Sequence, residues 1–366
     1  MLRVNTDMGR YIFILRKTLV LGLICFAIFL FSGCNTIGYY GQAISGHFKL
    51  MMQRQPIEAM IADSQTPQAV KSKLKQVLAI RAFAAKNLQL PIKGHFTRYV
   101  QLDRPYVAWA VFATPELSLK AKTWCYPVVG CTAYRGFFNK MQAQKLADNL
   151  AGQEFDVYVS GISAYSTLGW FDDPLLSTLL KRSKTDLAAL IFHELAHQIL
   201  YVADDTDFNE GFATAVEQAG LKLWLKTQND PKSFAAYKKG QRYYKQFSRL
   251  VLDWREKLGL LYNKPLPDDQ KRMCKAKIID GLRNAYGNLK ASWAGYSGYD
   301  AWFSGDLNNA KLNAVAAYDK LAPAFLALFD QNGRQFEQFY EASKKLAKLP
   351  KPERRRQLKK RLDINK

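Results

Sequence analysis

The chain contains two histidines four residues apart, with a glutamate directly after the first. They form the H-E-x-x-H pattern His193-Glu194-Leu195-Ala196-His197. On a helix, side chains four residues apart lie one above the other, so the two imidazoles can reach one Zn²⁺ ion. Glu194 is offset from that line and suits a general base acting on a water molecule. We therefore predict one zinc ion per chain, bound in part by His193 and His197.

The third metal ligand is expected to be a carboxylate, because histidine is scarce in this chain. Besides the two in the motif, only His47 and His95 are present, and both lie upstream. Twelve residues after the motif comes Asn209-Glu210-Gly211-Phe212-Ala213, in the first turn of a second predicted helix. Glu210 can face back towards the first helix across this short connection.

Together the two motifs resemble those of the gluzincin metallopeptidases. In the zinc aminopeptidase clan a helix with N-E-G-F-A follows the zinc helix, so the resemblance implies that Glu210 is the third ligand. The short connection and the stretch 164–174 are similar to a smaller family of predicted bacterial aminopeptidase lipoproteins. The resemblance implies a gluzincin-like fold and a lipid-anchored enzyme that hydrolyses N-terminal peptide bonds of peptides.

One part of the clan's pattern is missing. The large aminopeptidases bind the substrate's amine through a G-x-M-x-N strand, and the matching segment here, 161–165, has no carboxylate. Two alternatives therefore stay open: an endopeptidase of the cell envelope with the same machinery, and a non-enzymatic envelope lipoprotein that keeps zinc for stability.

Two tyrosines are candidates for stabilising the oxyanion during hydrolysis. Tyr165 lies in the loop before the first motif, and Tyr318 lies where related enzymes have a catalytic tyrosine. For each, the alternative is an aromatic residue that packs in the core. The Asp172-Asp173 pair could bind a substrate amine or cap a helix that begins at Pro174.

Other acidic residues near the motifs have less specific interpretations. Glu217 shares a helix face with Glu210 and could hydrogen-bond a zinc-bound histidine or be solvated. Asp204, Asp205 and Asp207 could bind Ca²⁺, but they lack the EF-hand spacing, and a solvated turn is the simpler interpretation.

The N-terminus is predicted to direct export. An apolar run from 18 to 31 follows several basic residues and is too short for a membrane-spanning helix. The run ends in Phe31-Ser32-Gly33-Cys34, which resembles a bacterial lipobox except for Phe31, where leucine is usual. We predict a signal peptide at 1–33 and lipidation of Cys34; an uncleaved anchor is the alternative. Asn35 in place of Asp favours the outer membrane, with the protein facing the periplasm.

Cysteines in the exported chain suggest one disulfide. Cys125 and Cys131 lie six residues apart around a turn-rich stretch, and the periplasm is oxidising. The alternative is a pair of buried thiols.

The chain is strongly basic but otherwise has the composition of a globular protein. Its net charge is +22, and 48% of its residues are hydrophobic. Eleven Lys and Arg against two acids lie in residues 344–366. Export makes nucleic acid an unsuitable partner, so this region is either a solvated helix or a contact with anionic lipid.

Hydrophobic periodicity predicts an α+β fold in one unit, 34–366. Residues 34–95 are expected to be mainly helical, 96–220 to be β-rich and to carry the zinc helices, and 221–366 to be helical. Within these parts, strands are predicted at 106–112 and 154–160. A helical region is predicted at 57–85, with a helix start at Thr66-Pro67. Helices are also predicted at 141–150 and 187–202, the last with Thr185 as its candidate cap.

Overall fold

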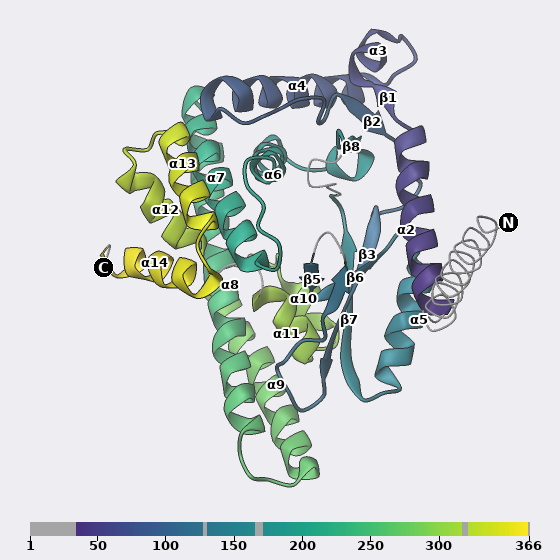
Figure 1. The fold of residues 1–366 in the computed structure, drawn as a ribbon, viewed down its shortest axis with the longest axis vertical. Coiled ribbons are helices and arrows are strands. Elements are labelled where there is room, and N and C mark those ends of the chain that lie inside the picture. Colours follow the sequence, from purple (N-terminus) through teal and green to yellow (C-terminus); the bar gives the residue numbers. More distant parts are fainter. Residues whose placement is uncertain (1–33, 127–129, 165–170, 317–320, 365–366) are drawn as a thin grey trace, which may run out of the picture. The chain divides into compact units, whose positions relative to one another are not determined.

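The computed structural model describes residues 34–126, 130–164, 171–316 and 321–364 (Figure 1). The predicted signal peptide, Tyr165 and Tyr318 lie outside these residues. Helices and short strands alternate along the chain, which confirms the mixed α+β class. The chain divides into two compact units, residues 1–52 and 53–366. Among the described residues, no helix combines the length and the apolar character needed to cross a membrane.

In the first unit the described part is helix α2, Cys34–Met52. Four large apolar side chains on α2 recur at intervals of four residues and are exposed: Tyr40, Ile44, Phe48 and Met52. The helix has no acidic residue, and its last turn carries Lys49. Side chains at this spacing follow one another along one side of a helix, so α2 presents an apolar stripe.

The main sheet of the second unit has β3 in its centre. This strand, Ala108–Pro115, pairs antiparallel with β6, Tyr134–Phe137, on one side and with β7, Phe155–Ile162, on the other. The strands predicted at 106–112 and 154–160 correspond to β3 and β7, shifted by one to three residues. β3 is buried along nearly its whole length, which explains its almost continuous apolar sequence.

Two smaller sheets complete the β structure. One joins β1, β2 and β8, with β2 parallel to β8 (Gln55–Pro56, Arg98–Val100 and Leu175–Leu176). The other is the hairpin of β4 and β5 (Trp124–Tyr126 and Gly130–Thr132). A disulfide links Cys125 to the opposite Cys131 across this hairpin.

Twelve α-helices are described in the second unit: α3 Ile57–Ala62, α4 Gln68–Leu88, α5 Lys140–Ala151, α6 Lys184–Ala196, α7 Thr206–Thr227, α8 Pro231–Tyr262, α9 Asp268–Ala291, α10 Asp300–Ser304, α11 Asn309–Ala316, α12 Ala322–Gln331, α13 Phe336–Ala347 and α14 Lys351–Ile364. The helical region predicted at 57–85 consists of two helices, α3 and α4, and α4 begins directly after the predicted start at Thr66-Pro67. Helix α5 matches the helix predicted at 141–150. No helix begins at Pro174, because the chain there forms β8 and a short 3₁₀ turn.

Aromatic contacts join the three helices around the H-E-x-x-H motif. The ring of Phe83 in α4 lies 5.9 Å from that of Phe192 in α6 and 4.9 Å from that of Trp224 in α7. Phe192 is fully buried, one residue before His193. This packing fixes the motif helix from behind, on the side away from its histidines.

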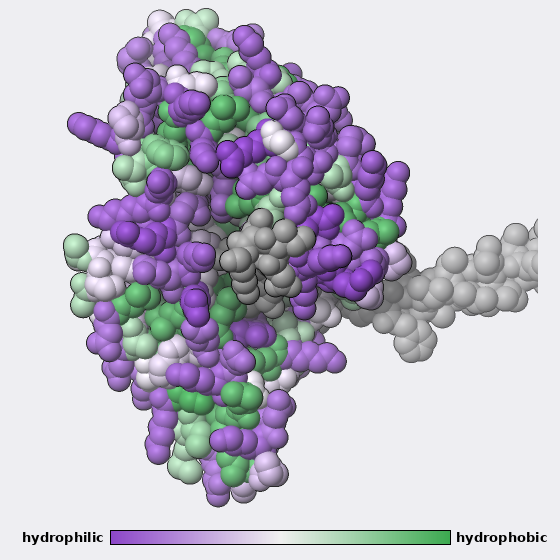
Figure 2. Space-filling view, turned by 90° about the vertical axis from the view of Figure 1, so that its left-hand side faces the viewer, coloured by the Kyte–Doolittle hydropathy of each residue, from purple (hydrophilic) through white to green (hydrophobic). Residues whose placement is uncertain are grey.

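Hydrophilic residues cover most of the face of the molecule in Figure 2, with small, separate apolar patches.

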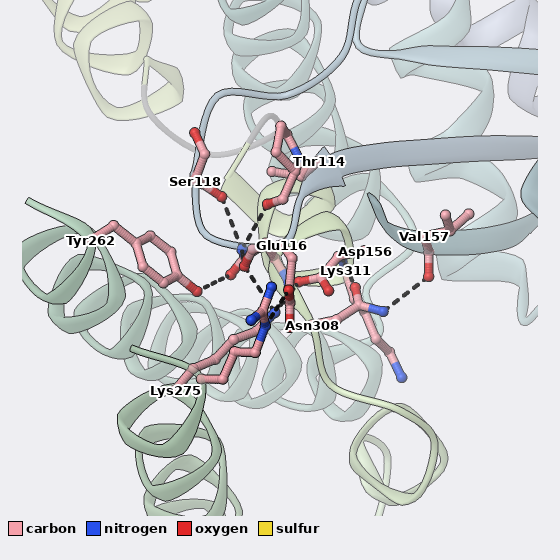
Figure 3. Close-up of polar contacts among 12 residues, drawn as sticks. Thr114, Glu116, Ser118, Asp156, Val157, Tyr262, Lys275, Asn308 and Lys311 are labelled. Atoms are coloured by element: carbon pink, nitrogen blue, oxygen red, sulfur yellow. Dashed lines mark hydrogen bonds and ion pairs between the residues drawn. The ribbon is translucent and has the colours of Figure 1, made fainter. Parts of the chain in front are cut away.

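A polar network fastens α11 to the end of the main sheet (Figure 3). The buried Asn309 accepts from the hydroxyl of Tyr262 at 2.9 Å, and its backbone N–H donates to Asp156 at 2.8 Å. Lys275 of α9 donates to the same Asp156 oxygen at 2.7 Å. The side-chain nitrogen of Asn309, Nδ2, lies 2.8–3.2 Å from the backbone oxygens of residues 115, 116 and 118. These bonds determine where α11 stands relative to β3.

Candidate metal centre

Helix α6 carries the motif and ends within it. Its N-cap is Ser183, whose hydroxyl accepts the backbone N–H of Asp186 at 3.0 Å, so Thr185 is not the cap. The helix stops at Ala196, and His197 occupies the C-cap position. The predicted continuation to 202 is wrong, because the chain turns there into the connection to α7.

Asn209, next to Glu210, closes that connection. Its side-chain oxygen accepts the N–H of Val202, and its side-chain nitrogen donates to the Val202 carbonyl, both at 2.8 Å. Asn209 is buried, so these two bonds hold the loop shut without competition from water. Helix α7 begins at Thr206, earlier than predicted, and Glu210 therefore lies in its second turn rather than its first.

The donor atoms of His193, His197 and Glu210 converge within 4.8 Å of one another. The Nε2 atom of His193 lies 3.3 Å from one Glu210 oxygen, and that of His197 lies 3.9 Å from the other. Ligands placed tetrahedrally about 2.1 Å from a zinc ion are about 3.4 Å apart. The spacing and the chemistry of this donor set therefore fit zinc.

Glu217 contacts His193, the first histidine of the motif. Of the two alternatives that the sequence left open for Glu217, the structure therefore favours a hydrogen bond to a histidine over a solvated side chain. One of its oxygens is 3.1 Å from Nδ1 of His193. A carboxylate can only accept, so the proton of a neutral imidazole is held at Nδ1. Nε2, which faces Glu210, is then left with the lone pair that a metal needs.

Burial and neighbouring charges give the two histidines opposite pKa shifts. Burial alone would lower the pKa of His193, but hydrogen bonds to Glu210 and Glu217 raise it well above the usual value. Burial and the charge of His193 lower the pKa of His197 to about 4. Burial would raise the pKa of Glu210, but the two histidines hold it below the usual value. In the metal-free centre, these hydrogen bonds therefore favour a proton on His193 over one on His197.

Glu194 has the pKa of a group that can exchange protons near neutrality. Burial raises its pKa to about 7; the charge of His193 opposes this rise, and the charges of Glu210, Asp173 and Glu217 add to it. A carboxyl group with such a pKa can accept a proton and release it again.

Asp173 is buried and does not cap a helix. Its carboxylate lies 3.6 Å from Nδ1 of His95, and its own N–H donates to that nitrogen at 3.1 Å. Asp172 instead accepts the N–H of Gly94 at 3.0 Å. The sequence did not separate the two aspartates; the structure buries only Asp173, and its charge acts on Glu194.

The acidic loop between the ligand helices is bound by the basic C-terminal helix, which corrects the solvated-turn interpretation. Asp205 is 1% exposed and accepts from Arg355 at 2.5 Å, with the buried Arg354 at 3.5 Å. Arg355 also pairs with Asp207 at 3.1 Å. The side chain of Asp204 accepts the N–H of Cys131 at 2.7 Å, which ties the disulfide hairpin to the same loop. Part of the basic C-terminus is therefore engaged inside the protein.

A cavity of about 180 Å³ adjoins the first turn of α7. Asp207 lines it, together with Arg255 of α8, Asn313 of α11 and mainly apolar side chains of β3, α11 and the loops beside them. Asp207 precedes Glu210 by three residues, so the two side chains lie on neighbouring turns of one helix face. The cavity was not foreseen, because its residues come from five separate parts of the sequence.

The structure defines a mainly helical α+β protein in which His193, His197 and Glu210 form a cluster of ligand atoms that could hold a metal ion. Residues 38–358 match the model of the protein family described as "Putative aminopeptidase". Because the match covers most of the chain, the protein belongs to this family of aminopeptidase-like hydrolases. No curated protein and no solved structure matches it.

Proposed function

We propose that the protein is a zinc-dependent aminopeptidase with a gluzincin-type centre. The observation that carries this proposal is the convergence of His193, His197 and Glu210 within 4.8 Å, with Glu194 beside them. The family match supports peptidase activity independently of this geometry.

Each residue has a defined role in the proposed reaction. His193, His197 and Glu210 hold the zinc ion, and Glu217 orients His193 through Nδ1. When bound, zinc would polarise the scissile carbonyl and make a water molecule more acidic. Glu194 accepts the proton of the attacking water and then delivers it to the nitrogen of the departing amine. Burial, which raises the pKa of Glu194 to about 7 in the metal-free centre, makes this carboxyl group a stronger base than an ordinary glutamate.

For the amine of the substrate, Asp173 is the acid that we propose. Its negative charge acts on Glu194, and the amine would have to reach a side chain that is 3% exposed and lies against His95. A carboxylate there would favour peptides with a free, positively charged N-terminus. An endopeptidase would not need that amine, so N-acetylation of a peptide separates the two activities: it should abolish cleavage by an aminopeptidase and leave an endopeptidase active.

The decisive experiment compares purified wild-type protein with Glu194→Gln on a peptide library read by mass spectrometry. We expect one zinc per chain in both proteins, removal of N-terminal residues by the wild type, and a loss of about 10²–10⁴-fold in rate for Glu194→Gln. His193→Ala should lose the metal. Equal activity of the wild type and Glu194→Gln at full zinc content would refute the mechanism.

We also propose that Cys34 carries a lipid that anchors the protein to the periplasmic side of the outer membrane. The lipobox-like sequence supports this, and the exposed apolar stripe of α2 begins six residues later, at Tyr40. Growth with labelled palmitate should label the wild type but not Cys34→Ala. Label that persists in the variant would contradict the anchor.

A further inference from the structure

The cavity beside α7 contains an arginine without an acidic partner. Arg255 donates through Nε to the side-chain oxygen of Asn313 at 2.7 Å. Of the carboxylates that the structure describes, none lies within 4.0 Å of its nitrogens. Burial lowers the pKa of this guanidinium, and no neighbouring charge offsets that effect.

The guanidinium of Arg255 is also held in place. The side-chain nitrogen of Asn313 donates to the hydroxyl of Thr114 at 3.0 Å and to the carbonyl of Leu119 at 3.1 Å. The oxygen of Asn313 must therefore face Arg255. The network around Asn309 fixes the helix from which Asn313 projects (Figure 3). A charged donor that is fixed before a ligand arrives loses little entropy when it binds one.

The other charged group of the cavity is already paired. Asp207 forms an ion pair with Arg355 at 3.1 Å, so its charge is balanced from outside the cavity. Arg255 is thus the charged group of the cavity lining that has no opposite charge within 4.0 Å among the described residues. The terminal nitrogens of a guanidinium form a fork that matches the two oxygens of a carboxylate.

Size and position suggest which part of a ligand enters. About 180 Å³ is less than the roughly 300–1,000 Å³ of sites that enclose whole ligands, so the cavity suits one end of a molecule. Asp207 places the cavity one turn of α7 from Glu210, which is a proposed zinc ligand.

We propose that Arg255 binds a carboxylate of the substrate, on the C-terminal side of the bond that is cleaved, and that the enzyme thereby prefers short peptides with a negative charge there. This inference rests on the proposed peptidase function. The carboxylate could be the C-terminus of a di- or tripeptide or the side chain of an Asp or Glu.

The test compares three substrates: trialanine with a free C-terminus, trialanine amide, and the amide of Ala-Glu-Ala. For the wild type we expect kcat/KM about 10- to 100-fold higher for the free acid than for trialanine amide. Arg255→Met should remove this difference: kcat/KM for the free acid should fall, and kcat/KM for trialanine amide should stay as in the wild type. Arg255→Lys should keep part of the difference. A rate for the Ala-Glu-Ala amide equal to that of the free acid would assign the carboxylate to a side chain.

Arg249→Met is the matched control, because Arg249 lies on the same helix but is exposed and forms its ion pair with Asp253. It should keep the preference. Thermal unfolding of each variant shows that the protein is folded. The inference is overturned if the wild type cleaves acid and amide equally, or if Arg255→Met slows both alike.

A binding measurement separates this inference from the proposed function. Calorimetric titration of the Glu194→Gln variant with trialanine and its amide requires no turnover. We expect tighter binding of the acid by about tenfold or more, and no preference once Arg255→Met is added. If the wild type cleaves peptides but the Glu194→Gln variant binds acid and amide equally well, the role of Arg255 is refuted and the proposed peptidase function is not. Preferential binding without cleavage by the wild type refutes the proposed hydrolysis and leaves the carboxylate site standing.

Discussion

Replacing Asp205 by alanine tests whether the C-terminal helix supports the metal centre. Asp205 is 1% exposed and contacts Arg355 at 2.5 Å and Arg354 at 3.5 Å. Arg354 is itself buried, so the substitution leaves a charge without its partner inside the protein. Breaking a buried ion pair in this way costs about 3–5 kcal/mol.

The loss of stability converts into a measurable shift. For the 314 residues from 53 to 366, an unfolding entropy of about 2.1 cal/mol/K per residue gives roughly 0.66 kcal/mol/K. Asp205→Ala should therefore lower the unfolding midpoint by about 5–8 °C in a calorimetric scan. Zinc binding, measured by competition with a chelator, should weaken as well, because Asp205 lies in the connection between His197 and Glu210.

The exposed Asp253, 3.8 Å from Arg249, provides the control. A surface pair contributes at most about 1 kcal/mol, so Asp253→Ala should shift the midpoint by less than about 2 °C. A midpoint for Asp205→Ala that matches this control would show that α14 does not support the loop.

Three further results are expected. Glu217→Ala removes the acceptor at Nδ1 of His193 and should weaken zinc binding by about 10- to 100-fold in a chelator competition; unchanged affinity would contradict the orienting role. Hydrogen bonds to Glu210 and Glu217 outweigh burial and keep the pKa of His193 high, so zinc must displace its proton. Zinc affinity should thus rise with pH, by about tenfold per unit while one proton is released, and a flat profile in calorimetric titrations would exclude that exchange. In Gly211→Ala the new Cβ would lie 2.7 Å from that of Leu321, which should cost about 1–3 kcal/mol in denaturant unfolding. Gly240→Ala, with open space around the glycine, is its control and should be neutral or slightly stabilising.

The H-E-x-x-H helix and its carboxylate partner follow from local pattern. Residues four apart on a helix must share a face, whatever surrounds them, so His193 and His197 could be paired from the sequence. The short connection to Glu210 left few ways for the two helices to separate. Strands β3 and β7 were foreseen for a similar reason, because runs of β-branched and aromatic residues favour a pleated, buried backbone.

Contacts between distant segments were decided by the tertiary structure. Nothing local in residues 351–364 indicates that Arg354 and Arg355 bind Asp205, about 150 residues earlier. Likewise, the contact of Glu217 with His193 depends on how α6 and α7 pack, and the cavity at Arg255 depends on how α7, α8 and α11 meet β3. Sequence spacing therefore paired His193 and His197 as proposed zinc ligands, because their geometry is local, and the family resemblance of the next helix added Glu210. The groups that orient, support and extend the centre were set by packing, which brings together residues that no spacing relates.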